Sequence, residues 1–426
     1  MPSVSGARAS GPPSGVVGAL TTRTLESVEA VEAVRATWEG LQGASLPTDI
    51  DYFLTVARFH PEVIRPHVVV VERSGTPVTL LVGYLQRGWI LHRIGPWDGY
   101  RPTVRSISVV YRGVIGEQSP ETIASGLASL RRSLDEGAAE LVHLRYLEPG
   151  GLLHGLARQT ATARGREHLV PARSHWSMSI GGSLQETLSH RSASTREGLR
   201  RLCRRIERAW GDALELELFD DLASAERLFD AVDDVASRSY QLHGRSVFRG
   251  SQLERELARL GLERDWYRAY VLSLGGRPAA FWTGYRYGGA FGWRGATGYD
   301  PAFGTYSPGT YVLVRLIETL SDDPAITLFD LGGGDVDYKP RFADRRWEEV
   351  DVRLLGPGLR PLGINAVGST FHAVHHGLRG VASLFGVHAA PTRLRRRRLK
   401  SAARAAAEPT VLATGDGARG APPPGR

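Results

Sequence analysis

The sequence predicts an α/β fold in which one arrangement of strands and helices occurs twice. Residues 68–88 and 269–289 align without a gap, and each reads as two strands joined by a Gly-x-Pro turn. Residues 119–134 and 307–320 both begin with Ser-Pro, continue as amphipathic helices and lead into an apolar strand. The same elements in the same order indicate a duplicated α/β domain.

Composition changes along the chain predict five segments. We expect a Gly/Ser/Pro-rich disordered leader at 1–20, a first domain at about 21–182 and a second at about 183–360. A helical basic segment is expected at 361–400, and an Ala/Gly/Pro-rich disordered tail at 401–426. Hydrophobic residues make up 42% and charged residues 23%, which is typical of soluble globular proteins. No apolar run is long enough to cross a bilayer.

The positive charge is concentrated at the C-terminal end. The whole chain has a formal net charge of +8, and residues 391–426 contain nine Arg or Lys and two Asp or Glu. That end carries +7, so the rest of the chain carries only +1. A tail containing RLRRRRLK can contact anionic lipid or nucleic acid, or it can be solvated and bind nothing.

The second of the two repeated helices could bind an anion. We expect Ser307 to cap it, so that the first turn at Gly309, Thr310 and Tyr311 presents free backbone N–H groups at the positive end of the helix dipole. In the first copy Glu121 occupies the place of Gly309 and would repel a phosphate. If one copy binds a phosphate-bearing ligand, it is therefore the second. The alternative is an ordinary capped helix.

The stretch DLGGGDVDYKPRFADR, residues 330–345, raises a choice between a phosphate loop, a metal loop and a turn. No Gly-Lys-Ser/Thr follows the glycines, and Asp335 and Asp337 would repel phosphate. The stretch reads better as the end of a buried strand, a sharp turn and a short helix. That geometry places Asp335, Asp337, Tyr338 and Lys339 at the carboxyl end of a strand, where open α/β sheets bind ligands. The alternative is a solvated turn with Tyr338 packed on the core.

These elements together resemble the GNAT acyltransferase superfamily. Within it, the chain is most similar to the tandem-domain branch of CelD-like cellulose-biosynthesis proteins and FemAB-like peptidyltransferases. The resemblance covers roughly residues 180–350 and includes the Ser-Pro-Gly helix start and the segment 239–248. The residues that match the motif of the branch are Asp330, Gly332, Gly333, Gly334, Asp335, Tyr338, Lys339, Arg341 and Phe342. The basic, spaced-glycine pyrophosphate loop of single-domain GNAT enzymes is missing.

The resemblance implies two tandem GNAT-like domains, each a mixed, mostly antiparallel sheet flanked by helices, with a basic helical tail. It implies acetyl-CoA or another acyl-CoA as co-substrate, no metal, and direct attack by an amine. Cofactor contacts are then expected from Gly295, Ala296 and Thr297, whose exposed N–H groups would form an oxyanion site, and from Ser307, Gly309, Thr310 and Tyr311. Asp335 or Asp337 would be the base or amine anchor, and Tyr338 the acid. Acceptor contacts are expected from Gln241, His243, Lys339 and Arg341.

The leading interpretation is an acyl-CoA-dependent N-acyltransferase that acts on an amino sugar or another small amine, with cell-surface polysaccharide synthesis as one setting. One rival is a FemAB-like aminoacyl-tRNA-dependent transferase that uses the arginines of 196–208; otherwise nucleic acid is not expected. The other rival is a non-catalytic transferase that binds a partner or a membrane through 362–400. Cys203 is expected to pack in the core, and His372–His376 not to bind metal. The expected location is cytoplasmic, with weak contact of the tail at the inner membrane face.

Overall fold

The computed structural model describes residues 19–90, 93–94, 97–160, 165, 172–239, 250–336 and 338–384. The N-terminal half contains β1 (Leu20–Leu25), α1 (Val28–Glu32), α2 (Arg35–Leu41), η1 (Leu46–Thr48), α3 (Ile50–Phe59), β2 (Val63–Pro66), β3 (Val68–Arg73), β4 (Thr76–Trp89), β5 (Arg93–Ile94), β6 (Trp97–Asp98), β7 (Thr103–Gly116), α4 (Pro120–Asp135), β8 (Leu141–Leu147) and α5 (Leu152–Thr160).

The C-terminal half continues with β9 (Arg173–Ser179), α6 (Leu184–Thr187), α7 (Ala193–Trp210), η2 (Gly211–Ala213), β10 (Leu214–Phe219), η3 (Leu222–Ser224), α8 (Ala225–Arg238), α9 (Gln252–Glu263), β11 (Tyr267–Leu274), β12 (Arg277–Tyr287), β13 (Ala290–Trp293), β14 (Thr297–Tyr299), η5 (Pro301–Tyr306), α10 (Pro308–Ser321), β15 (Leu328–Gly333), α11 (Lys339–Phe342), β16 (Arg345–Leu355) and α12 (Leu359–Leu384). The repeated hairpins are β3–β4 and β11–β12, and the repeated helix–strand pairs are α4–β8 and α10–β15. All of these elements confirm the predicted repeat.

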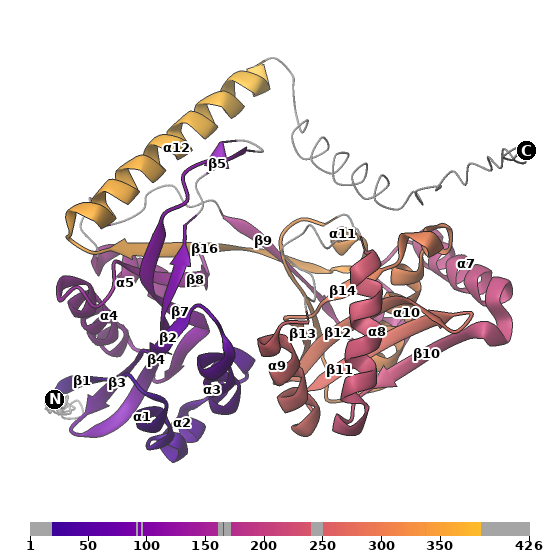
Figure 1. The fold of residues 1–426 in the computed structure, drawn as a ribbon, viewed down its shortest axis with the longest axis horizontal. Helices are drawn as coiled ribbons and strands as arrows, with labels where there is room; N and C mark the ends of the chain where they lie inside the picture. The colour runs from indigo at the N-terminus through magenta and orange to yellow at the C-terminus, as the bar shows by residue number, and fades with distance from the viewer. Residues whose placement is uncertain are drawn as a thin grey trace, which may run out of the picture.

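One sheet runs through both halves (Figure 1), in the order β1-β3-β4-β7-β8-β16-β9-β15-β13-β12-β11-β10, with β2 on β4 and β14 on β12. β7 and β8 are parallel in the first half, and β13 and β15 are parallel in the second. The repeated hairpins are antiparallel. Each half is therefore a mixed, mostly antiparallel sheet flanked by helices, which confirms the expected fold class.

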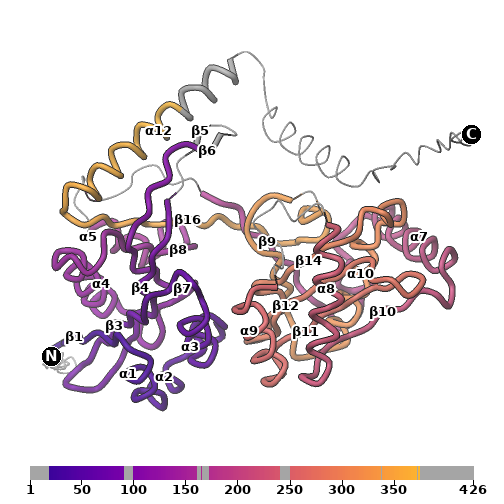
Figure 2. Tube along the Cα trace, viewed as in Figure 1, coloured from indigo at the N-terminus to yellow at the C-terminus, as the bar shows by residue number. Residues whose placement is uncertain are grey.

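The two halves exchange strands at their junction. β9 pairs with β15 and β16, and β16 pairs with both β9 and β8. Figure 2 shows the chain passing between the halves at β9 and again at β16. β9 thus lies among the strands of the second half although it precedes the expected boundary at 182/183. The division of the chain into domains at that boundary remains a proposal.

Helices cover both faces of the sheet and define its cores. α4 and α5 pack on one face of the first half, and α7 and α10 pack on one face of the second. The opposite faces are covered by α1, α2 and α3 in the first half and by α8 and α9 in the second, and their buried residues form one continuous cluster. α3 and α9 contact each other across the junction. The two halves therefore meet at the contact between α3 and α9.

Candidate active site

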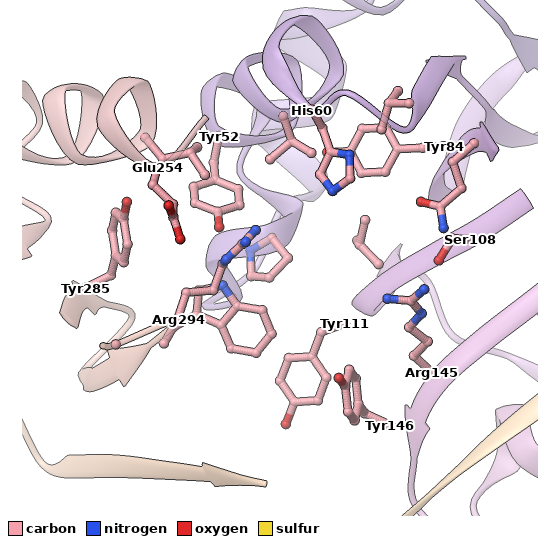
Figure 3. Close-up of a pocket in the computed structure, with 18 of the residues that line it drawn as sticks. Tyr52, His60, Tyr84, Ser108, Tyr111, Arg145, Tyr146, Glu254, Tyr285 and Arg294 are labelled. Carbon is pink, nitrogen blue, oxygen red and sulfur yellow. The ribbon is translucent and has the colours of Figure 1, made fainter. Parts of the chain in front are cut away.

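A cavity of about 550 Å³ lies where the two halves meet (Figure 3). The first half contributes residues of α3, β4, β7 and β8, and the second contributes residues of α9, β12 and the turn between β13 and β14. Six tyrosines line it: Tyr52, Tyr84, Tyr111, Tyr146, Tyr267 and Tyr285. Rings and hydroxyl groups together are typical of a pocket for a small polar ligand.

Two arginines and a histidine face this cavity (Figure 3). Arg145 comes from β8, Arg294 from the turn after β13, and His60 follows α3. Burial lowers the pKa of His60, and the charges of Arg294 and Arg145 lower it further, so His60 is neutral at pH 7. Its Nδ1 accepts a hydrogen bond from the Glu62 amide at 3.1 Å, which leaves Nε2–H as a donor. Glu254 is the carboxylate among the described lining residues, and its Oε2 accepts from Ser251.

The duplication extends to the bulge that carries Arg294. Arg294 has a φ of 47°, and Arg112, at the corresponding place in β7, has a φ of 52°. A glycine follows each arginine. A Cβ on Gly295 would lie 2.5 Å from the Thr283 carbonyl oxygen, and a Cβ on Gly113 would meet a backbone oxygen at 2.7 Å. Both bulges therefore need glycine at the second position and hold a non-glycine residue in the left-handed region at the first.

The amides around the second bulge are used within the fold. Gly295 N donates to Gly292 O at 2.9 Å, and Ala296 N donates to Thr283 Oγ1 at 3.1 Å. Thr297 lies in β14, which pairs with β12. The exposed N–H groups that the sequence analysis expected are therefore absent at Gly295 and Ala296, because the bulge satisfies its own donors. Gly295 and Ala296 nevertheless line the cavity.

The start of α10 differs from the expectation. Ser307 has a left-handed backbone (φ 54°, ψ 53°), and its side chain does not cap the helix, because η5 ends directly at this residue. The Thr310 and Tyr311 amides donate to the Ser307 carbonyl at 3.0 and 3.2 Å. A Cβ on Gly309 would meet only the Tyr299 ring, at 3.8 Å, so the space beside it is open.

The first copy has the cap that the second lacks. Ser119 Oγ accepts from the Thr122 amide at 3.2 Å, and Glu121 lies in the first turn of α4. In the second copy the Tyr311 side chain is buried, and its hydroxyl donates to Glu207 at 3.3 Å, so this residue belongs to the core. The anion site that the sequence predicts at α10 is thereby reduced to the Gly309 amide and the helix dipole.

The glycine triplet forms the expected sharp turn. Gly332 and Gly334 have φ values of 76° and 86°, which strongly favour glycine. The buried Lys339 closes the turn, because its Nζ donates to Gly332 O at 2.9 Å and to Gly333 O at 2.8 Å. Burial lowers the pKa of Lys339 to about 8, although the charges of Asp330 and Asp335 oppose that shift. In this structure Lys339 holds the turn.

The polar residues that follow the glycine turn differ in exposure. Asp335 is exposed, and its Oδ1 accepts from Trp176 Nε1 at 3.1 Å. Tyr338 is half-buried and lies edge-on against Trp282, with ring centroids 5.8 Å apart. Burial raises the pKa of Tyr338 to about 12, so it keeps its proton at neutral pH. Arg341 is exposed on α11.

A buried histidine at the junction was missed by sequence reasoning. His175 Nε2 lies 2.6 Å from Asp330 Oδ1, and its Nδ1 lies 3.0 Å from Glu349 Oε2. Its ring stacks on Trp347, with centroids 4.4 Å apart, and Tyr111 covers the site from β7. Burial alone would lower the pKa of His175, but Asp330 and Glu349 raise it to about 9. The pair of carboxylates therefore holds a charged imidazolium between β15, β9 and β16.

This cluster predicts a pH-dependent stability. Because the folded-state pKa of His175 is raised from 6.5 to about 9, its contribution is complete below pH 6.5 and is lost as pH rises through 9. Relative to His175→Gln, the native protein should lose up to about 3 kcal/mol of unfolding free energy between pH 6.5 and 9.5. Urea unfolding of both proteins at several pH values measures this difference, and parallel pH profiles would contradict it.

The arginines of α7 are partly committed to intramolecular contacts. Arg204 pairs with Glu197 at 2.6 Å, and Arg205 donates to the Thr305 carbonyl at 2.7 Å. Arg201 is exposed on the same helix. Cys203 lies in the core as expected, where burial raises its pKa to about 11 and leaves an unreactive thiol at neutral pH.

Several expectations lie outside the described residues: Asp337, Gln241, His243, and the tail 391–426. His372–His376 lie in α12, and no group of three or more His, Cys, Asp or Glu that could hold a metal is found within the described part of the chain. None of the described helices is long and apolar enough to span a bilayer.

The functional residues that the sequence analysis did not identify differ in whether a sequence pattern marks them. Arg294–Gly295 repeats Arg112–Gly113 at the corresponding place after each hairpin, and that match was readable in the sequence. His175 and Glu349 leave no such signal, because they approach Asp330 only through pairing of β9 with β15 and β16.

A family model matches one segment of the chain, and several solved structures are similar at low identity. Residues 193–340 match the family model described as acetyltransferase (GNAT) domain. No curated protein matches the sequence. One similar solved structure is the C-terminal DUF2156 domain of a protein from Agrobacterium fabrum named as a lysylphosphatidylglycerol synthetase. It shares 12% identity over 81% of this chain and 97% of its own, with a TM-score of 0.48.

Two further structures are similar at low identity. A tandem GNAT protein from the clavulanic acid biosynthesis pathway shares 14% identity over 80% of this chain and 99% of its own, with a TM-score of 0.45. A GCN5-related N-acetyltransferase from Kribbella flavida shares 12% identity over 80% of this chain and 72% of its own, with a TM-score of 0.37. The segment 193–340, which matches the acetyltransferase (GNAT) domain model, includes the bulge at Arg294, α10 and the glycine turn.

Proposed function

We propose that this protein is an acyl-CoA-dependent N-acyltransferase whose acceptor amine binds in the cavity between the halves. The observation that carries the proposal is that one wall of this cavity is the bulge at which two strands of the sheet separate. Gly295 and Ala296 line it, and they form the bulge at which β13 gives way to β14. Among the described residues, β13 pairs with β15 at Ala290 and Phe291 only, and β14 pairs with β12 only. The parallel strands therefore separate beside the cavity, inside the segment that matches the GNAT model.

The start of α10 fits the phosphates of a coenzyme A derivative. The Ser307 side chain does not cap this helix, and the space beside Gly309 is open. The dipole and the Gly309 amide can therefore face an anion there. The acyl-CoA supplies an activated thioester, and α10 would hold it by its pyrophosphate, with the acyl group toward Thr297 and the separated strands.

The reaction forms a C–N bond and breaks the C–S bond of the thioester. The amine loses a proton to a base, for which Asp335 and Asp337 are the candidates, and Tyr338 returns a proton to the departing thiolate. Asp335 and Tyr338 do not line the cavity, so in this proposal the amine reaches toward the glycine turn between the separated strands. Approach of the two bound substrates across the separated strands would supply much of the acceleration. Lys339 positions the turn, and Arg341, Gln241 and His243 remain candidates for contact with the acceptor.

We infer a small amine such as an amino sugar as acceptor, a role in cell-surface polysaccharide synthesis, and a cytoplasmic location with the basic tail near an anionic membrane surface. The partial engagement of the α7 arginines offers no specific support for a tRNA acceptor stem.

Acetyl-CoA should raise the melting temperature of the protein by a few degrees, because a ligand of the native state at about 100 times its Kd adds about 2.7 kcal/mol. Release of free CoA thiol in the presence of a panel of amines then measures turnover. ADP, which has a pyrophosphate but no pantetheine arm, is the control and should stabilise less. A protein that neither gains stability with acetyl-CoA nor releases CoA with any amine would not be this enzyme.

A further inference from the structure

Two arginines in the cavity between the halves have no carboxylate partner. Arg145 Nε donates to His143 Nδ1 at 3.2 Å, and neither Arg145 nor Arg294 forms an ion pair with a described residue. Arg238, which is half-buried like Arg145, pairs with Asp234 and Asp300. Glu254 is the carboxylate among the described lining residues and its charge raises the pKa of Arg294, so the cavity holds two cations against one carboxylate.

Such an arrangement costs free energy unless a ligand completes it. A guanidinium that loses water without gaining an anion pays a desolvation penalty, and burial accordingly lowers the pKa of Arg145. Arg294 also keeps a left-handed backbone, which a non-glycine residue adopts at a cost of about 1 kcal/mol or more. Arg294 is exposed and lines the cavity. Its guanidinium is therefore available to a ligand.

The two arginines act on the same space from opposite halves. His60, Arg145 and Arg294 line the same cavity and face a common volume (Figure 3), and the charges of both arginines lower the pKa of His60. His60 Nε2–H adds a neutral donor there. Tyr52, from α3, is buried, and its hydroxyl faces Arg294, whose pKa it raises. These donors suit an oxyanion.

We propose that the acceptor amine carries an oxyanion group, a carboxylate or a phosphate, which Arg145 and Arg294 bind together. This inference rests on the proposed function and names its substrate class: a small anionic amine, such as an amino acid or a phosphorylated amino sugar. When the anion binds, Arg145 from the first half and Arg294 from the second half contact the same oxyanion group. The acceptor thereby bridges the halves beside Gly295, where the strands separate.

Direct binding of simple anions tests the site. Calorimetry with inorganic phosphate and with succinate should show binding to the full chain, and Arg145→Gln and Arg294→Gln should each raise the Kd of at least one anion about 10-fold or more. Arg294→Lys keeps the charge, so its Kd should lie between those of the native protein and Arg294→Gln. Arg112→Gln is the matched control, because it changes the equivalent bulge of the first copy and should leave binding intact. Circular dichroism checks that each variant folds.

Turnover separates carboxylate from phosphate. With acetyl-CoA, the protein should use glucosamine 6-phosphate or 2-amino-2-deoxygluconate with kcat/KM about 100-fold above that for glucosamine, and either glutamine variant should remove most of this preference. Anion binding that ignores both arginines, including binding at α10 alone, overturns the proposal. Turnover of neutral amines without any anion preference does so too, and leaves the transferase function standing. Arginine-dependent anion binding without acyl transfer supports the site and overturns the function.

Discussion

Tyr338→Phe should lower kcat by about 10²–10⁴-fold with little change in the Kd for acyl-CoA. The substitution keeps the ring that lies edge-on against Trp282 and removes only the hydroxyl. The lost interaction is made to a leaving group in the transition state, so binding of the ground state should be spared. Steady-state release of CoA and calorimetry with acetyl-CoA measure the two quantities.

The pH profile distinguishes an acid from a packing residue. Because burial raises the pKa of Tyr338 to about 12, the native enzyme should show no loss of activity from this group up to about pH 10. The rate ratio of native to Tyr338→Phe protein should therefore stay constant below that pH. Asp335→Asn is the companion variant: if Asp335 is the base it moves the acidic limb, and if it only accepts from Trp176 the limb stays. Native rates in both variants would make the turn structural.

Gly309→Glu should abolish measurable acyl-CoA binding. It places a carboxylate in the first turn of α10, where the phosphates are proposed to sit, and so reproduces Glu121 of the first copy. Two like charges about 5 Å apart at an effective dielectric constant of about 20 repel by about 3 kcal/mol, or more than 100-fold in Kd. The helix should still form, because the nearest atom to a Cβ there is 3.8 Å away and glutamate favours a first turn.

Gly309→Gln is the matched control for this substitution. It has the same length without the charge, so it should cost about 10-fold or less in affinity if repulsion is the cause. Equal losses in both variants would indicate that bulk, and not charge, blocks the ligand. Full acetyl-CoA affinity in a folded Gly309→Glu protein would place the phosphates away from α10.

Local sequence patterns determined most of the elements. The aligned hairpins became β3–β4 and β11–β12, and the Ser-Pro helices became α4 and α10, because strand alternation, helix periodicity and turn residues act over a few positions. The glycine triplet determined a sharp turn for the same reason, since Gly332 and Gly334 adopt positive φ values. The duplication was readable, and with it the mixed α/β fold.

Tertiary structure decided which side chains meet. His175 and Asp330 are 155 residues apart, and only the insertion of β9 between β15 and β16 joins them. Arg145 and Arg294 share a cavity because the two halves pack face to face, a contact that no local pattern encodes. Ser307 has a capping sequence but not a capping conformation, because η5 delivers the chain to it in a left-handed turn. Propensity sets the elements over short range, whereas pairing across the sheet sets the site.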